Sequence, residues 1–218
     1  MTIDPITIVF AVVAIFVAWR LWAVLGTRTG AERPPAPRPA RFGGDVVDVT
    51  PNRPAASERW RGIAAPDSAL ARGLDAVAAG DPTFDAAHFL AGARVAYEMI
   101  LNAFAAGDEE ALSRLLAPEP LANFSRAIGA RKAAGQRMSV TLVSIDGAEI
   151  VEAGAPNGAA QVTVKFAAKL NSVTTDSAGQ VVEGSATQVA NHVDVWTFAR
   201  PVASPDPNWR LAATEATH

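Results

Sequence analysis

The side chains best suited to acid–base chemistry are the single tyrosine, Tyr97, and the pair His192 and Asp194. His192 and Asp194 are two residues apart, so in a strand both point to one face, where the carboxylate could orient the imidazole. A site of the ketosteroid-isomerase type would combine an aspartate base with a tyrosine donor. Tyr97, however, falls on the apolar stripe of a predicted helix. We therefore expect a core tyrosine whose hydroxyl is bonded at the edge, and a His192–Asp194 pair that is structural or exposed.

Other reactive groupings are missing from the sequence. The chain has no cysteine and only three histidines, His88, His192 and His218, which are too few and too scattered for a metal cluster. It also has no serine elbow, phosphate-binding loop or dinucleotide-binding turn. We therefore expect no catalytic, cofactor-binding or metal-binding residues and no enzymatic activity.

Four helices are predicted in the first half of the domain from apolar periodicity and capping residues. The longest covers residues 86–106 and ends at Gly107. Its apolar stripe recurs every three or four residues and consists of Phe89, Ala93, Tyr97, Ile100 and Phe104. Shorter helices are predicted over residues 69–79, from Asp108 to before Pro118, and from near Pro120 to Lys132.

After Gly135 the pattern changes to that of β-strands. Strands are predicted over residues 139–145, 148–152 and 161–166, with residues 171–175 as an extension of the last of these past a bulge. Further strands are predicted within 181–198 and over 208–213, with a turn at 176–180. Helices followed by a run of antiparallel strands predict an α+β domain in which a curved sheet wraps around the long helix.

Trp196 and Phe198 share a strand face with His192 and Asp194, whereas Val193 and Val195 lie on the other face. We favour packing of the long helix on Trp196 and Phe198, and the alternative exposes Trp196 as a partner contact. A pocket for an acyl chain or for an apolar side chain of a peptide would then lie between helix and sheet. The candidate residues for this hydrophobic pocket or partner surface are Phe89, Leu90, Tyr97, Trp196 and Phe198.

The N-terminal stretch reads ITIVFAVVAIFVAWRLWAVL over residues 6–25, with Arg20 as its only charge. A helix of this length crosses a hydrocarbon core of about 30 Å, and Arg20 is close enough to its end to snorkel. A cleaved signal peptide would have basic residues before the apolar run, but Asp4 lies there, and the arginines follow it. A buried core helix is the other alternative. We expect residues 1–25 to be a single-pass anchor of the inner (plasma) membrane, with the N-terminus outside and the domain in the cytoplasm.

Residues 26–66 form a Pro/Arg-rich linker with seven basic and four acidic side chains, a balance of +3. Two apolar islands interrupt it, residues 46–49 and 60–65, which are either incidental or short docking segments. The predicted domain, residues 67–218, holds eleven basic and seventeen acidic side chains, a balance of −6. This balance argues against nucleic acid as a partner, whereas the basic linker suits an anionic lipid surface.

Three blocks of sequence lie within residues 81–211: DPTFDAAHFLAGARVAYEMILNAFAAGDEEALSRLL, residues 124–131, and HVDVWTFAR with NWRL behind it. Together they resemble the Tim44-like domain. The N-terminal half is similar to that of anchored bacterial members, which have a single span and an Arg/Pro tether. The resemblance implies a cone-shaped helix-plus-sheet fold of the nuclear-transport-factor-two-like type.

The resemblance also implies that the protein acts as an adaptor. The mitochondrial member of the family binds cardiolipin-containing membrane and tethers a chaperone to the import channel, and a sister branch is ribosomal. This chain departs from the mitochondrial pattern because it lacks that member's long charged N-terminal region. We expect an adaptor that binds translocase, chaperone or envelope proteins near the inner membrane, in protein translocation or membrane-protein quality control. The alternatives are a ribosome- or anionic-lipid-binding tether, and a cone-fold small-ligand carrier or enzyme.

Overall fold

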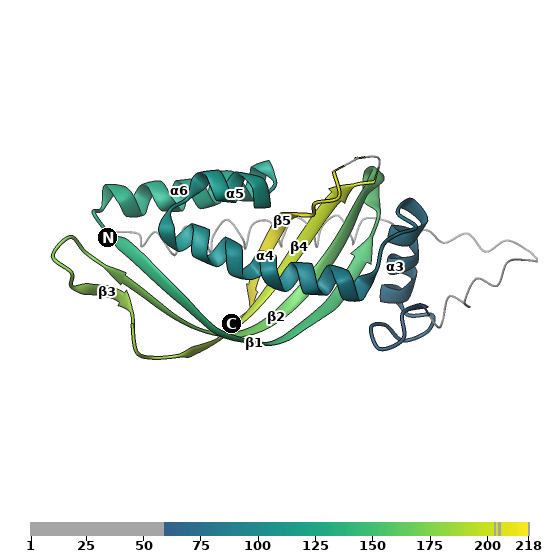
Figure 1. The fold of residues 1–218 in the computed structure, drawn as a ribbon, viewed down its shortest axis with the longest axis horizontal. Coiled ribbons are helices and arrows are strands. Elements are labelled where there is room, and N and C mark those ends of the chain that lie inside the picture. Colours follow the sequence, from purple (N-terminus) through teal and green to yellow (C-terminus); the bar gives the residue numbers. More distant parts are fainter. Residues whose placement is uncertain (1–58, 203, 205, 218) are drawn as a thin grey trace, which may run out of the picture. The chain divides into compact units, whose positions relative to one another are not determined.

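A long helix, α4, lies across one face of a curved antiparallel sheet (Figure 1). The computed structural model describes residues 59–217 except 203 and 205. The helices are α3 (Ala69–Gly80), α4 (Ala86–Ala106), α5 (Glu109–Leu115) and α6 (Pro118–Ala133). The strands are β1 (Arg137–Gly154), β2 (Ala159–Thr175), β3 (Val181–Gly184), β4 (Ala190–Pro201) and β5 (Arg210–Thr217), with a short 3₁₀ turn, η1 (Pro156–Gly158), between β1 and β2.

The predicted α+β class is confirmed, since helices come first and antiparallel strands follow. The predicted anchor, residues 1–25, and the first apolar island, residues 46–49, lie outside the described residues. Within the described part of the chain, no helix is both long and apolar enough to cross a bilayer.

The helix boundaries follow from capping side chains. The N-terminal caps of α3, α4 and α5 are Ser68, Asp85 and Asp108, and each accepts a hydrogen bond from a backbone N–H of the first turn. Gly107 ends α4 in the left-handed conformation, with φ of 69°. Helix α6 begins at Pro118, earlier than the expected start near Pro120, because proline suits the first helical position, where no backbone donor is needed.

The strands differ from the prediction in their continuity. The order in the sheet is β1-β2-β4-β5, with β3 paired to the end of β2. Strand β1 is long and continuous, where the sequence predicted two short pieces, and β2 is also continuous, as expected if residues 171–175 extend the strand over 161–166. Three register shifts in β1, beginning after Leu142, Ile145 and Ile150, interrupt its alternation and bend the strand. The stretch predicted as one strand within 181–198 is instead two, β3 and β4.

The core lies between α4 and the concave face of the sheet. The Tyr97 ring packs 4.6 Å from the ring centroids of both Phe166 and Trp196, and Phe89 contacts Phe198 edge-on at 6.0 Å. The prediction that the Trp196 and Phe198 face packs against the long helix is therefore confirmed.

The second apolar island is part of this core. Trp60 is 3% exposed, its ring packs 6.1 Å from that of Phe84, and its Nε1–H donates a 2.9 Å hydrogen bond to Asp75 on α3. The folded part of the chain therefore begins by Arg59, upstream of residue 67, which the sequence indicated as the domain boundary. Proline at residues 54 and 66 suggested a linker, but the long-range contacts of Trp60 are what fix this segment.

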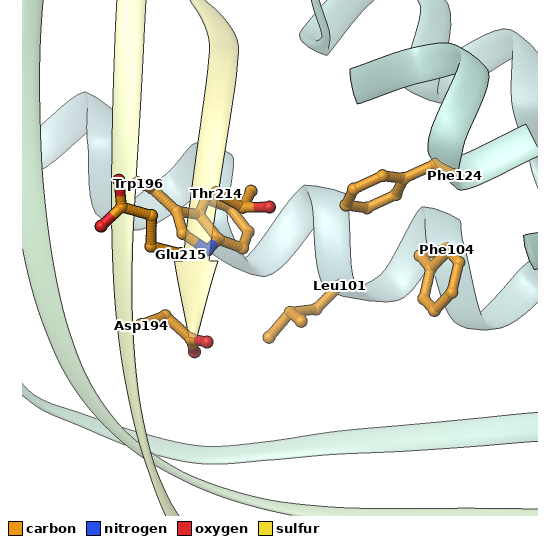
Figure 2. Close-up of a pocket in the computed structure, with 7 residues that line it drawn as sticks. All are labelled: Leu101, Phe104, Phe124, Asp194, Trp196, Thr214 and Glu215. Atoms are coloured by element: carbon orange, nitrogen blue, oxygen red, sulfur yellow. The ribbon is translucent and has the colours of Figure 1, made fainter. Parts of the chain in front are cut away.

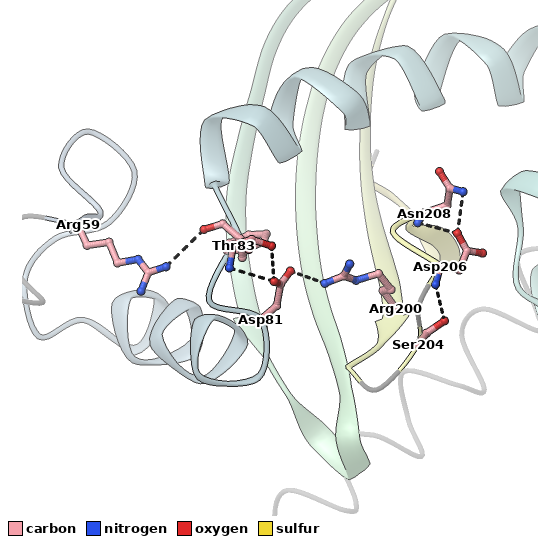
Figure 3. Close-up of polar contacts among 8 residues, drawn as sticks. Arg59, Asp81, Thr83, Arg200, Ser204, Asp206 and Asn208 are labelled. Atoms are coloured by element: carbon pink, nitrogen blue, oxygen red, sulfur yellow. Dashed lines mark hydrogen bonds and ion pairs between the residues drawn. The ribbon is translucent and has the colours of Figure 1, made fainter. Parts of the chain in front are cut away.

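A polar clamp joins the α3–α4 connection to the end of β4 (Figure 3). Arg200 donates to the Asp81 carboxylate, and the two side chains are 12% and 15% exposed. Thr83 donates to Asp81 from both its backbone N–H and its hydroxyl. Arg200 also lies over the Trp209 ring at 5.4 Å. The clamp thus ties together elements that are more than 100 residues apart in the sequence.

This clamp predicts a pH dependence of stability. The Thr83 hydrogen bonds, and with them Arg200, hold the pKa of Asp81 below its ordinary value of 3.8. A carboxyl whose pKa is lower in the folded state contributes stability that is complete above the unfolded-state pKa and is lost as the pH falls through the folded-state value. We expect the difference in the free energy of unfolding between wild type and Asp81→Asn to be largest at neutral pH and to shrink below about pH 4. Urea denaturation at several pH values measures it, and a difference that is constant down to pH 2 would contradict the assignment.

Candidate functional site

A cavity of about 220 Å³ opens between the C-terminal half of α4, helix α6 and the last two strands (Figure 2). Helix α4 contributes Leu101 and Phe104, and α6 contributes Phe124. Strand β4 contributes Asp194 and Trp196, and β5 contributes Thr214 and Glu215. The walls are therefore mainly apolar, with a few polar groups from the strands.

The helices supply the apolar walls by ordinary periodicity. Leu101 and Phe104 are three residues apart on α4 and so share a face. The ring of Phe104 meets that of Phe124 edge-on, with centroids 5.1 Å apart. All three side chains are only partly buried, so they are accessible at the cavity.

The strands supply the polar groups by register. Asp194 and Trp196 are two apart on β4 and face α4, and Thr214 lies opposite Trp196 on β5. Glu215 lies opposite Val195 instead, so its side chain projects from the other face of the sheet, and Figure 2 shows its carboxylate pointing away from Leu101 and Phe124. Of the two acidic residues at the cavity, only Asp194 presents its carboxylate to the interior.

Asp194 is held by Tyr97. The Tyr97 hydroxyl donates a 2.6 Å hydrogen bond to Oδ2 of Asp194, and the tyrosine is fully buried. Burial raises the pKa of the Tyr97 hydroxyl well above its ordinary value of 10.0, and the hydrogen bond and negative charge of Asp194 raise it further. The tyrosine therefore stays protonated and acts as a fixed donor to the carboxylate.

Of the candidate acid–base residues, only Tyr97 and Asp194 are hydrogen-bonded to each other within the described structure. The only hydroxyl proton of Tyr97 is engaged by Asp194, so it is not directed at a substrate oxygen. His192 lies on β4 opposite Ala168 and makes no hydrogen bond to Asp194 in the described structure. His88 is exposed on α4, and His218 lies outside the described residues. The described residues also contain no group of three potential metal ligands.

Of the five residues that the sequence predicted as a hydrophobic pocket or partner surface, only some lie at the cavity. Trp196 lines the cavity, and Tyr97 holds one of its polar groups. Phe89 and Phe198 are buried against each other, and Leu90 packs on the core at the same end of α4. These last three residues are core residues.

The cavity residues that were not singled out could be found only in part from sequence. Phe104 belongs to the predicted apolar stripe of α4, whereas Leu101 lies next to that stripe and Phe124 lies on α6. Their common exposure depends on where α6 crosses relative to β5, which no local pattern reveals. Thr214 was not predicted as a site residue, because the predicted last strand ended at residue 213.

The fold is that of an α+β domain in which a long helix packs on a curved antiparallel sheet, with a mainly apolar cavity at one end of the helix. A family model described as the Tim44-like domain matches residues 70–216. The chain belongs to the Tim44-like domain family, as the sequence resemblance predicted.

The chain was also compared with curated protein sequences and with solved structures. No curated protein sequence matches the chain. Among solved structures, the chain is similar to the crystal structure of the intermembrane space region of chloroplast protein ARC6, with 15% sequence identity and a TM-score of 0.44. That similarity covers 62% of this chain and 98% of the ARC6 region.

Proposed function

We propose that this protein is a membrane-anchored adaptor whose Tim44-like domain binds a protein partner close to the inner membrane. The observation that carries the proposal is the open cavity formed by Leu101, Phe104, Phe124 and Trp196. Aromatic-lined pockets are typical anchor sites of interfaces, and Leu101, Phe104 and Phe124 are only partly buried where they line this one.

Membership of the Tim44-like family supports an adaptor role near a membrane. The apolar run over residues 6–25 supports a single span, and the arginines that follow it support a cytoplasmic domain and an outside N-terminus. The helix-plus-sheet arrangement is in keeping with a cone of the nuclear-transport-factor-two-like type. The proposal assigns the domain a binding role and no reaction.

A protein is favoured over ribosomal RNA or anionic lipid as the ligand of the domain. The balance of −6 over residues 67–218 opposes contact with phosphate-rich surfaces. The basic segment at residues 26–66 is the part of the chain suited to anionic headgroups. Anchor and linker would therefore determine where the protein works, and the cavity which partner it binds.

Two substitutions on α4 test the proposal. Leu101 lines the cavity, whereas Val95 is 58% exposed elsewhere on the same helix. Leu101→Glu places a charge in the pocket, and we expect it to reduce recovery of the partner at least tenfold when tagged protein is crosslinked in native membranes and purified in detergent. Val95→Glu introduces the same side chain on the same helix and should leave recovery unchanged. Equal recovery with both variants, or no specific protein with wild type, would contradict the adaptor proposal.

A further inference from the structure

Asp194 is a carboxylate in a mainly apolar cavity, and within the described residues it has no cationic partner. Its side chain is half-buried, and it faces Leu101 across the opening in Figure 2. Within the described residues its one hydrogen bond is from Tyr97, and it takes part in no ion pair. Removing a carboxylate from water is costly unless a counter-charge or donors compensate it. The cavity therefore carries an unmatched negative charge in its wall.

The geometry leaves one side of this charge available to a ligand. Tyr97 donates to Oδ2, and no described residue donates to Oδ1. The tyrosine ring is fully buried and packs against both Phe166 and Trp196, so its hydroxyl is held in place and orients the carboxylate. Tyr97 is thus a positioning residue for Asp194.

Aromatic rings line the same cavity as this carboxylate. Trp196 is on the same strand face, two residues from Asp194, and the edge-on pair Phe104 and Phe124 lies across the cavity. Aromatic faces attract cations, and they also pack well against methylene stems. A volume of about 220 Å³ suits one long side chain. The combination matches a group with an apolar stem and a positively charged end.

We propose that the cavity receives an arginine or lysine side chain of the partner protein, with the methylene stem against Leu101, Phe104 and Trp196 and the charged end at Asp194. This proposal rests on the adaptor function proposed above and names the chemistry of its partner. The charge balance of −6 over residues 67–218 complements a basic segment of the partner around that side chain.

The test compares arginine with citrulline, which has nearly the same shape but no charge. The probes are the peptides Ac-Ala-Leu-Arg-Leu-Ala-NH₂ and Ac-Ala-Leu-Cit-Leu-Ala-NH₂, titrated by calorimetry into the full chain in lipid nanodiscs made of zwitterionic lipid. We expect the arginine peptide to bind at least about tenfold more tightly than the citrulline peptide, because a charge-assisted hydrogen bond to a carboxylate is lost. The preference should shrink as salt is raised from 50 to 500 mM.

Three variants assign the effect to Asp194. Asp194→Asn keeps the shape and should abolish the preference for arginine, and Tyr97→Phe keeps the ring but releases the carboxylate and should reduce the preference. Glu149→Gln removes an exposed charge on β1, outside the cavity, and should bind both peptides as wild type does. If Asp194→Asn fails to fold, the salt dependence of the two peptides on wild type still decides the question.

Equal binding of the two peptides to wild type, or binding of neither, would overturn the inference. A preference that survives in Asp194→Asn would overturn it as well. So would saturable binding of dodecanoate to wild type and Asp194→Asn alike without discrimination between the peptides, because an acyl chain would then be the occupant. If Leu101→Glu loses the membrane partner while the peptides bind equally, only this inference fails. If Leu101→Glu retains the partner, the adaptor proposal itself fails.

Discussion

Replacing Trp60 by alanine is expected to lower the free energy of unfolding of the domain by about 3–5 kcal/mol, the cost of removing a large buried aromatic side chain. Trp60 is 3% exposed, contacts Phe84 and donates to Asp75. The substitution would leave a cavity beneath the segment that joins linker and domain, and an unpaired carboxylate oxygen on α3. Few single changes outside the α4–sheet core should cost as much.

Urea denaturation monitored by far-ultraviolet circular dichroism measures this loss. Trp60→Phe is the matched control, because it keeps a ring against Phe84 and loses only the indole donor, so it should cost about 1–2 kcal/mol. A fragment of residues 52–218 should also be markedly more stable than one of residues 67–218. A Trp60→Ala variant as stable as wild type would mean that residues 59–65 are not part of the folded domain.

Gly73→Ala is expected to destabilise the domain by about 1–3 kcal/mol through overpacking, although alanine is normally the better helix former. Gly73 lies in α3 where the helix meets β1, and a Cβ added there would overlap the backbone carbonyl of Ala153. The neighbouring atoms are backbone, so they cannot rotate aside, and helix or strand must shift.

Gly92→Ala on α4 is the matched control, since a Cβ at that position meets nothing within 4 Å. It should stabilise the domain by about 0.5–1 kcal/mol, the usual gain from replacing a helical glycine. Thermal unfolding of the two variants should therefore shift in opposite directions from wild type. Shifts of the same sign would contradict the close packing of α3 on β1.

Features that depend on neighbouring residues could be predicted from the sequence. The capping side chains Ser68, Asp85 and Asp108, and the left-handed Gly107, are local signals, and the structure places the helix ends at them. The strands were harder because the register shifts in β1 resemble strand ends in a sequence read one segment at a time. The docking of Trp60 was not predictable, because its partners Asp75 and Phe84 become neighbours only after α3 has folded back.

The candidate site likewise combines features that local sequence predicts with features that depend on how distant elements pack. Its apolar residues on α4 follow from helical periodicity, and the shared face of Asp194 and Trp196 follows from strand alternation. The hydrogen bond between Tyr97 and Asp194 spans 97 positions of the sequence and depends on the crossing of α4 over β4, so no spacing rule finds it. The cavity itself lies where Phe124 of α6 meets Phe104 of α4, beside Trp196, which is only 5% exposed.

Site-specific photo-crosslinking in living cells tests whether the cavity of the domain holds a protein partner at the membrane. A benzoyl-phenylalanine residue replaces Phe124 at the cavity in one variant and the exposed Val95 in the other. We predict a discrete protein adduct from position 124, weakened by Asp194→Asn, and none from position 95. The same adducts from both positions, or only lipid adducts from position 124, would contradict the account.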